Sequence, residues 1–368
     1  MRILYLSRSY TPHDHRFLSA MVEAGHEAAY LCLDGMVQSV ETRPLPDGVH
    51  QVSPFSVSGP FGLPWQVAEL RRLGEKLAPD VVHAGPVQSA AFRAALAGLQ
   101  PLVTMSWGSD LLMGARRGPG RWLARYALRH SDVLVCDCQT VKKAAEALGM
   151  PGDRIVVFPW GVDLEHFHPG PDHGLRSRLG WQQTFVLLST RSWEPIYGIE
   201  TLLAGFVAAA CEDASLRLLM LGDGSLRPRI EAVVRRAGIA DWIHFAGRVA
   251  YADLPKFYRA SDLYLSASRS DGSSVSLLEA MACGLPAVVS DIAGNREWVE
   301  PGVTGWWFRD GEARALREAI LFARAAALPP MGEAARAVVE ARADWRRGQA
   351  ELMRAYALAC SVARSEVG

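Results

Sequence analysis

The stretch SASRSDGSSVSLLEAMACGLPAVVSDIAGNREWVEPGVTG, residues 266–305, decides the fold of this chain. An apolar run at 263–265 precedes it and is typical of a buried strand. Residues 277–282 then form a short apolar helix, which the glycine and proline that follow bring to an end. Residues 287–290 are a second apolar run, so the segment predicts a βαβ unit. Such units bind ligands at the carboxyl ends of their strands and at the helix N-terminus.

Two acids and a run of small residues lie at that end of the unit. Asp271 is in the loop, and Glu279 follows eight residues later, early in the predicted helix. Between them lie backbone N–H groups that can bind an anion, those of Gly272, Ser273, Ser274 and Val275. Carboxylates on both sides of such donors suit a sugar nucleotide, which has hydroxyls at both ends and phosphates in the middle. The alternative is an ordinary βαβ unit with one surface acid and one helix-capping acid.

The bulk composition describes an ordinary globular protein. The 368 residues allow two or three domains at roughly 100–200 residues per domain. Hydrophobic residues make up 49% of the chain and charged residues 21%, which is enough for large cores. The 39 basic and 39 acidic residues balance, so nothing global predicts a nucleic-acid partner.

The N-terminus and the cysteines predict a cytoplasmic protein. The opening MRILYLS, residues 1–7, has the pattern of a strand rather than of a signal peptide. No apolar run approaches the ~20 residues of a membrane span. The six cysteines are scattered through apolar runs, so we interpret them as reduced thiols and expect no zinc site.

Short apolar strands alternate with helical patterns from residue 1 to residue 158, which predicts a parallel, doubly wound sheet. The loop after the first strand lacks a GxGxxG, so a dinucleotide site is not supported. It carries His13 and His15 instead, on either side of Asp14. Either these residues face a ligand cleft, or the loop is solvated and Asp14 caps the next helix. His83, at the end of another strand, is either a second cleft residue or a hydrogen-bonded core histidine.

A segment rich in Pro, Gly, His and Asp, residues 159–174, is typical of a linker between domains. A second series of strands and helices with the same architecture starts at residue 185. Arg191 ends the first strand of this series, where a guanidinium can bind a diphosphate. Arg248 follows another strand and a glycine, at a place where a ligand can approach the backbone. The alternative for Arg191 is a surface arginine that makes a salt bridge, and the alternative for Arg248 is a solvated turn.

The spacing of Asp271 and Glu279, together with the run EAMACGLP at 279–286, resembles the donor-binding motif of a known family. These are the retaining GT-B glycosyltransferases of family 4, also called group 1. The segment at 159–174 is similar to the one that joins the two domains in that family. The resemblance covers nearly the whole chain and is strongest from about residue 161 to residue 305.

The resemblance implies a GT-B fold, in which two Rossmann-like α/β domains face each other across a cleft. It places an N-terminal acceptor domain at residues 1–165 and a C-terminal donor domain at residues 166–345. Residues 346–368 are then a last helix that crosses back to the N-terminal domain.

The resemblance also implies roles in the donor site. It assigns Asp271 to the hydroxyls of the donor sugar and Glu279 to the ribose. It assigns Arg191 to the diphosphate leaving group and Arg248 to the nucleotide base. Two positions depart from the family. Asp271 stands where the family usually has Glu, and Tyr197 stands where it has a lysine, so the second position carries no charge at neutral pH.

In the first domain, the family commonly has His-Gly-x-Asp where this chain has WGSD at 107–110. Tryptophan cannot exchange protons, so Trp107 can only pack against a sugar or donate a hydrogen bond to it. Asp110 stays a candidate catalytic residue, as a ligand of the acceptor or of the sugar. The candidate residues of the acceptor cleft are His13, His15, His83 and Trp107.

The resemblance implies that the chain moves a sugar, with retention, from a nucleoside diphosphate sugar to a glycan, lipid or small-molecule acceptor. It implies no metal and no cofactor besides the donor, because Arg191 and backbone N–H groups stabilise the negative charge of the diphosphate. Two alternatives stay open. One is a sugar-nucleotide epimerase or hydrolase of the same fold. The other is a catalytically silent subunit that binds a nucleotide, which the departures at Trp107 and Tyr197 motivate.

Five arginines surround one predicted helix of the first domain, namely Arg116, Arg117, Arg121, Arg125 and Arg129. A basic amphipathic helix can rest on an anionic membrane, which would place the protein at the inner face of that membrane. The alternative is a solvated helix face above a stripe of core residues.

Overall fold

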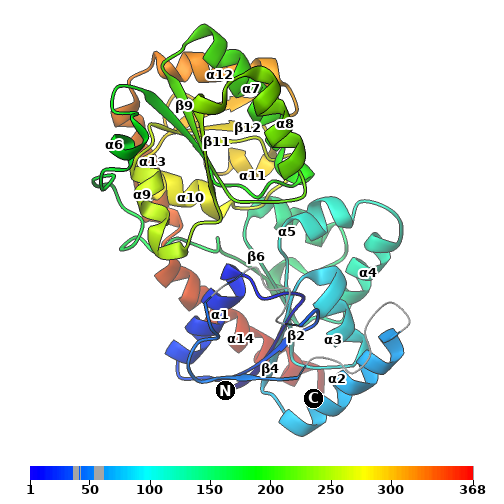
Figure 1. Ribbon diagram of the computed structural model, residues 1–368. Coiled ribbons are helices and arrows are strands. Elements are labelled where there is room, and N and C mark those ends of the chain that lie inside the picture. The colour runs from blue at the N-terminus through cyan, green and yellow to red at the C-terminus, as the bar shows by residue number, and fades with distance from the viewer. Residues whose placement is uncertain (36–40, 42, 54–61, 368) are drawn as a thin grey trace. The chain divides into compact units, whose positions relative to one another are not determined.

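The computed structural model describes residues 1–35, 41, 43–53 and 62–367. The chain forms two compact units, of which the first consists of Met1–Pro159 and Arg347–Gly368 and the second of Trp160–Arg346. Each unit is built on a parallel sheet that helices cover (Figure 1). The prediction of two doubly wound α/β domains is confirmed.

The sheet of the first unit has seven strands in the order β3-β2-β1-β4-β5-β6-β7. All of its neighbouring strands are parallel. The strands are β1 (Arg2–Ser7), β2 (Glu27–Cys32), β3 (Val49–Gln51), β4 (Val81–Ala84), β5 (Leu102–Met105), β6 (Val133–Cys136) and β7 (Ile155–Val157). The central strands are buried along nearly their whole length. A sheet covered on both faces requires continuous apolar runs, which is why the sequence predicts these strands.

The helices of the first unit lie between these strands and at the end of the chain. They are α1 (Pro12–Glu23), α2 (Leu63–Leu77), α3 (Phe92–Leu96), α4 (Gly118–Arg129), α5 (Gln139–Glu146) and α14 (Trp345–Val367). Two π-helical turns, η3 (Val87–Ala91) and η4 (Asp110–Gly114), follow β4 and β5. The last helix buries Leu352, Ala355, Tyr356 and Ala359, and residues 347–368 belong to the first unit. The last helix thus crosses back to the N-terminal domain, as the sequence predicts.

Helix α1 begins earlier than the sequence indicates. Thr11 is its N-cap, and the backbone N–H of Thr11 donates to Asp14 while the Thr11 hydroxyl accepts from the N–H of Asp14. This capping box shortens the loop after β1, because it fixes the first turn of the helix. His13 and His15 therefore lie in a helix rather than in a loop. Asp14 takes part in the cap as the third residue of the helix and is fully buried, whereas the N-cap itself is Thr11, which corrects the interpretation of a solvated loop capped by Asp14.

The sheet of the second unit has six strands in the order β10-β9-β8-β11-β12-β13, all parallel. The strands are β8 (Phe185–Ser189), β9 (Leu216–Leu221), β10 (Ile243–Gly247), β11 (Leu263–Ser266), β12 (Ala287–Ser290) and β13 (Gly305–Phe308). Its helices are α6 (Leu175–Leu179), α7 (Ile199–Glu212), α8 (Arg227–Ala237), α9 (Leu254–Arg259), α10 (Val275–Ala282), α11 (Ala293–Arg296), α12 (Ala313–Arg324) and α13 (Leu328–Arg342). Two hydrophobic clusters pack on this sheet.

Three elements have only a weak sequence signal. β3 has three residues and no buried side chain, and α2 buries only Gln66 and Leu70. β13 follows a turn that is rich in proline and glycine and has the sequence GWWF.

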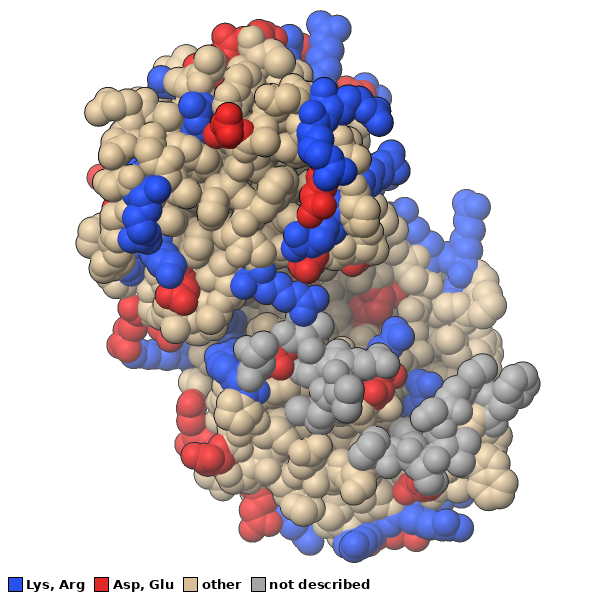
Figure 2. Space-filling view, viewed as in Figure 1, with Lys and Arg blue, Asp and Glu red and all other residues tan. Residues whose placement is uncertain are grey.

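Charged side chains of both signs are interspersed on the face of the molecule that Figure 2 shows. This mixture agrees with the balanced composition and shows no broad surface of one sign on that face. None of the helices in the described part of the chain carries an apolar segment long enough to cross a bilayer.

Candidate functional site

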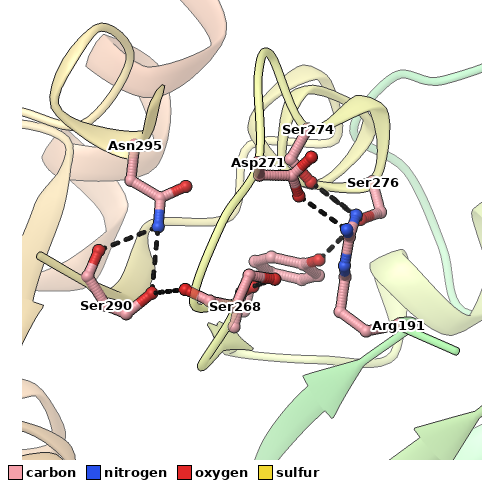
Figure 3. A network of polar contacts seen from close by, with 9 residues as sticks. Arg191, Ser268, Asp271, Ser274, Ser276, Ser290 and Asn295 are labelled. Carbon is pink, nitrogen blue, oxygen red and sulfur yellow. Dashed lines mark hydrogen bonds and ion pairs between the residues drawn. The ribbon is translucent and has the colours of Figure 1, made fainter. Parts of the chain in front are cut away.

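The centre of the candidate site is Arg191, which lies just after the carboxyl end of β8. Its Nη1 donates to the hydroxyls of Ser274 at 2.8 Å and Ser276 at 3.0 Å. Its Nη2 donates to Oδ2 of Asp271 at 2.5 Å, which makes an ion pair. These three partners come from the loop after β11 and from the first turn of α10, and all three turn toward the guanidinium (Figure 3). The structure thus brings together Arg191, Asp271 and Ser274, which the sequence predicts for one site.

Tyr197 joins the same cluster from a single 3₁₀ turn before α7. Its ring centroid lies 4.1 Å from Cζ of Arg191, which is a cation–π contact. A lysine at this position would add a positive charge, whereas the tyrosine ring supports the charge already present. Arg191 therefore has an anion on one side and an aromatic face on another.

Burial shapes the electrostatics of this ion pair. The side chains of Arg191 and Asp271 are 11% and 18% exposed. Burial raises the pKa of Asp271, and the charge of Arg191 and hydrogen bonds only partly oppose that rise. For Arg191, burial lowers the pKa and Asp271 raises it, with a net rise. The Nε atom of Arg191 is buried and has no hydrogen-bond partner among the residues described. The guanidinium stays charged, but its charge is balanced by Asp271.

The N-terminus of α10 offers backbone donors beside this pair. Ser274 is the N-cap, but its hydroxyl accepts from Arg191 and makes no capping bond to its own helix. The hydroxyl of Ser273 accepts from Nε1 of Trp298 at 2.9 Å, which fixes the loop. The first N–H groups of α10, starting at Val275, thus lack a side-chain cap and can serve an anion.

The loop that carries Asp271 and Gly272 packs tightly on α11. A Cβ added to Gly294 would lie 2.5 Å from the carbonyl oxygens of both Asp271 and Gly272, so only glycine fits there. Behind the loop, the hydroxyl of Ser290 donates to the carbonyl of Ser268 at 2.5 Å. Asn295 Nδ2 donates to the carbonyl of Ser290 at 2.8 Å (Figure 3). These contacts tie the loop after β11 to β12 and α11.

Glu279 lies in the middle of α10 rather than early in it, and it is 7% exposed. Its Oε2 accepts from the hydroxyl of Tyr258 at 2.8 Å. The Tyr258 hydroxyl also lies 3.2 Å from Oγ1 of Thr190, the residue before Arg191. Tyr258 therefore links the glutamate to the strand end that carries the arginine.

Arg248 is an exposed residue at the carboxyl end of β10. It follows Gly247, which has a φ of 67° and whose carbonyl accepts from Gly222 at 2.7 Å. The pKa of Asp223 is lowered by Arg227, by the N–H of Gly224 and, to a smaller degree, by Arg248. Arg248 and Arg191 thus both follow the carboxyl ends of strands of one parallel sheet, β10 and β8.

In the first unit, Trp107 lies against His13. Their ring centroids are 5.2 Å apart, with one ring on the loop after β5 and the other on the first turn of α1. Nε1 of Trp107 is buried and has no partner in the described part of the chain. His15 instead contacts Tyr10, whose hydroxyl lies 2.6 Å from Nδ1, and partial burial lowers the pKa of His15.

Asp110 uses its carboxylate to hold the loop in which it lies. It accepts from the hydroxyl of Ser106 at 2.7 Å and from the N–H groups of Val87, Trp107 and Leu111 at 2.9, 3.1 and 3.0 Å. Burial raises its pKa and these hydrogen bonds oppose the rise. With four donors on one carboxylate, Asp110 positions Trp107.

His83 lies inside the core of the first unit and not at a surface, which corrects the interpretation of its ring as a cleft residue. It is fully buried, and its Nδ1 lies 2.7 Å from the hydroxyl of Tyr356 on α14. Burial lowers its pKa to about 3, so the ring is neutral at physiological pH. The alternative interpretation, a hydrogen-bonded core histidine, describes it.

Sequence reasoning missed three side chains of the site, Tyr258, Ser276 and Asn295. Tyr258 and Asn295 come from elements on either side of the motif, and no spacing rule connects them to it. Ser276 lies inside the motif, and its position two residues after Ser274 was the available signal. Among the described residues, no three His, Cys, Asp or Glu side chains form a group that could hold a metal ion.

Two family models match the chain. The one described as Glycosyltransferase Family 4 matches residues 13–166, and the one described as Glycosyl transferases group 1 matches residues 183–324. Together they match most of both units.

Curated relatives match part of the chain. A D-inositol 3-phosphate glycosyltransferase of Geodermatophilus obscurus is 31% identical over 186 residues, which are 48% of this chain and 41% of that protein. One of the same name from Actinosynnema mirum is 31% identical over 227 residues, 58% of this chain and 54% of that protein. The chain spans about half the length of the curated relatives that it matches.

Solved structures match nearly the whole chain. HepE of Anabaena, in complex with UDP and glucose, has a TM-score of 0.80 and 21% identity, with 96% of this chain and 98% of that chain covered. Sucrose-phosphate synthase of Thermosynechococcus elongatus has a TM-score of 0.81 and 19% identity, with 97% and 98% covered. At these identities the likeness shows the fold. With its two family matches and its GT-B fold, the chain belongs to the group 1 glycosyltransferases of family 4.

Proposed function

We propose that this chain transfers a sugar from a nucleoside diphosphate sugar to an acceptor, with retention at the anomeric carbon. The second unit holds the donor and the first unit receives the acceptor. The observation that carries the proposal is the cluster of Arg191, Asp271, Ser274 and Ser276 at the N-terminus of α10. A helix N-terminus beside a fixed guanidinium is an arrangement that binds phosphate groups.

The cluster supports catalysis by stabilising the leaving group. As the bond to the sugar breaks, the oxygens of the departing diphosphate gain negative charge. Arg191 is fixed by three hydrogen bonds and one ring contact, so it does not need to reorganise when that charge develops. We propose that this guanidinium and the N–H groups of α10 stabilise the charge of the diphosphate without a metal ion. We also propose that no cofactor besides the donor takes part in the reaction.

Asp271 and Glu279 are the proposed ligands of the donor sugar and the ribose. Arg248, at the edge of the same sheet, is the proposed neighbour of the base. On the acceptor side we propose His13 and Trp107, whose rings contact each other and can pack against a sugar.

Names of relatives suggest acceptors of more than one chemistry. They include D-inositol 3-phosphate glycosyltransferases and an alpha-monoglucosyldiacylglycerol synthase of Streptococcus pneumoniae. The structural neighbour HepE was solved with UDP. We therefore propose a uridine or guanosine diphosphate sugar as the first donors to test, since another relative is named as GDP-mannose-dependent.

A thermal-shift screen of nucleoside diphosphates and nucleotide sugars tests the donor half of the proposal. A ligand at 100 times its dissociation constant adds about 2.7 kcal/mol to the free energy of unfolding, which is easily measured. The stabilising donor is then followed by nuclear magnetic resonance with and without a panel of acceptors. Conversion of the donor alone identifies an epimerase or hydrolase, and donor binding without any product identifies a silent subunit. Formation of an α-linked product from an α-linked donor, only in the presence of an acceptor, supports the proposal.

A further inference from the structure

Two tyrosines of the second unit place their hydroxyls in the candidate site, Tyr258 on α9 and Tyr264 on β11. Both side chains are fully buried, with 0% of each exposed. A buried hydroxyl is costly unless it makes hydrogen bonds, whereas a phenylalanine would fill nearly the same volume without that cost. The contribution of these two residues therefore depends on the partners of their hydroxyls.

The hydroxyl of Tyr258 holds the carboxylate of Glu279. It donates to Oε2 of Glu279 at 2.8 Å and lies 3.3 Å from the carbonyl oxygen of Ser276. Because a phenol has one hydrogen, the Tyr258 oxygen accepts in its 3.2 Å contact with Thr190, and the Thr190 hydroxyl donates. Thr190 thus directs the hydrogen of Tyr258 toward α10. This arrangement favours one orientation of the Glu279 carboxylate.

Tyr264 reaches Arg191 by way of Ser276. Its hydroxyl lies 2.8 Å from Oγ of Ser276, and the same Oγ accepts from Nη1 of Arg191 at 3.0 Å. A serine side chain has three staggered rotamers, and the bond to Tyr264 favours the one that faces the guanidinium (Figure 3). Burial raises the pKa of Tyr264, while the charge of Arg191 and hydrogen bonds with Ser276 and Thr190 oppose the rise. The phenol and the guanidinium therefore belong to one buried polar network.

The sheet fixes the position of Tyr264 relative to the arginine. Tyr264 lies in β11 and is the register partner of Leu188 on the neighbouring strand β8. Leu188 precedes Arg191 by three residues. Tyr258 belongs to the same hydrophobic cluster as Tyr264. Groups that are held by a packed core reorganise little when a ligand binds, which is what a site that stabilises developing charge requires.

We propose that Tyr258 and Tyr264 are positioning residues of the donor site, Tyr258 for Glu279 and Tyr264 for Arg191 through Ser276. The proposal rests on the proposed function, because it takes Glu279 as the ligand of the ribose and Arg191 as the ligand of the diphosphate. The two tyrosines then act on different parts of the donor. Tyr258 sets the preference for a nucleotide with intact ribose hydroxyls, and Tyr264 sets the affinity for the diphosphate.

The first test compares UDP with dideoxy-UDP, which lacks both ribose hydroxyls, and GDP with dideoxy-GDP. Calorimetry measures the affinities of the full chain and of its variants. In Tyr258→Phe we expect the affinity for the intact nucleotide to fall about three- to tenfold and the affinity for the dideoxy analogue to stay unchanged. In Tyr264→Phe we expect both to fall by about that factor. The matched control Tyr356→Phe removes a buried tyrosine hydroxyl from the first unit and should change neither affinity.

The ratio of the two affinities separates positioning from a general loss of stability, which would not act on one ligand alone. Equal losses for both ligands in Tyr258→Phe, or parental affinities in both variants, contradict the proposal. A parent that binds the intact and the dideoxy nucleotide equally well also contradicts it, since Glu279 would then not contact the ribose. A parent that binds neither UDP nor GDP contradicts both this proposal and the choice of donors.

The second test asks whether each tyrosine acts through its named partner. If Tyr264 acts through Ser276, then Tyr264→Phe should cost no further affinity in a chain that already carries Ser276→Ala. In the same way, Tyr258→Phe should cost nothing further in a chain that carries Glu279→Ala. Losses that simply add in either double variant would show that the tyrosine acts by another route and would overturn that assignment.

Turnover of the bound nucleotide sugar distinguishes this proposal from sugar transfer itself. We expect Tyr264→Phe to lower kcat and Tyr258→Phe to raise KM with kcat near that of the parent, each by about three- to tenfold. A parent that binds the nucleotides with the expected ratios but forms no product contradicts sugar transfer and leaves the positioning roles in place. A parent that forms product, with both phenylalanine variants equal to it in kcat and KM, contradicts the positioning roles alone.

Discussion

At the scale of single residues, Arg191 is the side chain on which the proposed chemistry depends. Arg191→Ala removes a fixed charge that acts on the developing diphosphate, so we expect turnover at saturating donor to fall by about 10²–10³. Arg191→Lys should recover only part of this, because a lysine cannot bridge Asp271 and both serines. Steady-state turnover of both variants checks the prediction. If Arg191→Ala turned over like the parent, the diphosphate would not bind at this strand end.

The two acids of the motif should respond differently to substitution. Asp271 balances the charge of Arg191, so Asp271→Asn frees that charge, and we expect nucleoside diphosphate affinity that is unchanged or higher. Glu279→Ala removes the proposed ribose ligand, and we expect the affinity for the nucleoside diphosphate to fall by about 10–10²-fold. Glu279→Gln is the control for folding, because its amide oxygen can still accept from Tyr258. Calorimetry with the nucleoside diphosphate measures all three. A larger loss in Asp271→Asn than in Glu279→Ala would contradict these assignments.

Asp14 gives the stability of the first unit a pH dependence of definite sign. Burial raises the pKa of this carboxyl from 3.8 to about 6, although Thr11 and Tyr5 oppose the rise with hydrogen bonds. Between these values the folded chain binds a proton that the unfolded chain does not bind. The contribution of Asp14 to the free energy of unfolding is therefore largest below about pH 4 and falls as the pH rises to about 6.

Comparison with Asp14→Asn isolates this contribution, because the variant has no carboxyl to titrate. We expect the difference in free energy of unfolding, parent minus variant, to decline from about pH 4 to about pH 6 and to stay level above that. Urea unfolding at a series of pH values measures it. Parallel curves for the two proteins would mean that the pKa of Asp14 is ordinary.

At the scale of elements, the support of the Asp271 loop by α11 can be tested without touching a ligand contact. In Gly294→Ala the new methyl would lie 2.5 Å from two backbone carbonyls, so the loop has to move. We expect weaker binding of the nucleoside diphosphate together with a lower melting temperature. In the control Gly170→Ala the methyl meets only the flexible end of Arg259, at 3.3 Å. Calorimetry and thermal unfolding compare the two, and equal affinities would show that the loop shape is not needed.

Elements with strong local patterns could be predicted from the sequence, and elements that neighbours stabilise could not. The strand at 287–290 has the predicted bounds, because a strand buried on both faces must be a continuous apolar run. β3 is short and without a buried side chain, so its three residues carry no such run.

The same limit applies to the candidate site. Arg191 and Asp271 could be predicted because each follows a strand of recognisable pattern, and their ion pair is a consequence of two adjacent parallel strands, β8 and β11. Tyr258 could not be predicted, since its contact with Glu279 depends on how α9 packs on α10. Asp110 and His83 also follow or end predicted strands, but their contacts are structural. Asp110 accepts hydrogen bonds within its own loop, and His83 contacts Tyr356 in the core.

At the scale of the whole molecule, the first unit is held together by residues from both ends of the sequence. Tyr356 on α14 contacts His83 on β4, and both side chains are fully buried. Tyr356→Phe would leave Nδ1 of His83 without that partner, and we expect the free energy of unfolding of the first unit to fall by about 1–3 kcal/mol. Urea unfolding measures the change. The control is the affinity of Tyr356→Phe for the nucleoside diphosphate. We expect it to equal that of the parent, because the residues proposed to bind the donor all lie in residues 160–346.

The discontinuous chain path of the first unit has a consequence for synthesis. The second unit is one uninterrupted stretch, Trp160–Arg346, whereas the first unit is complete only when Arg347–Gly368 has been added. On the ribosome, the half of the protein that emerges first is therefore the half that finishes folding last. At 5–20 residues per second, roughly 10–40 seconds pass while the second unit is made. For that time the apolar surface that α14 later covers is open to chaperones and to aggregation.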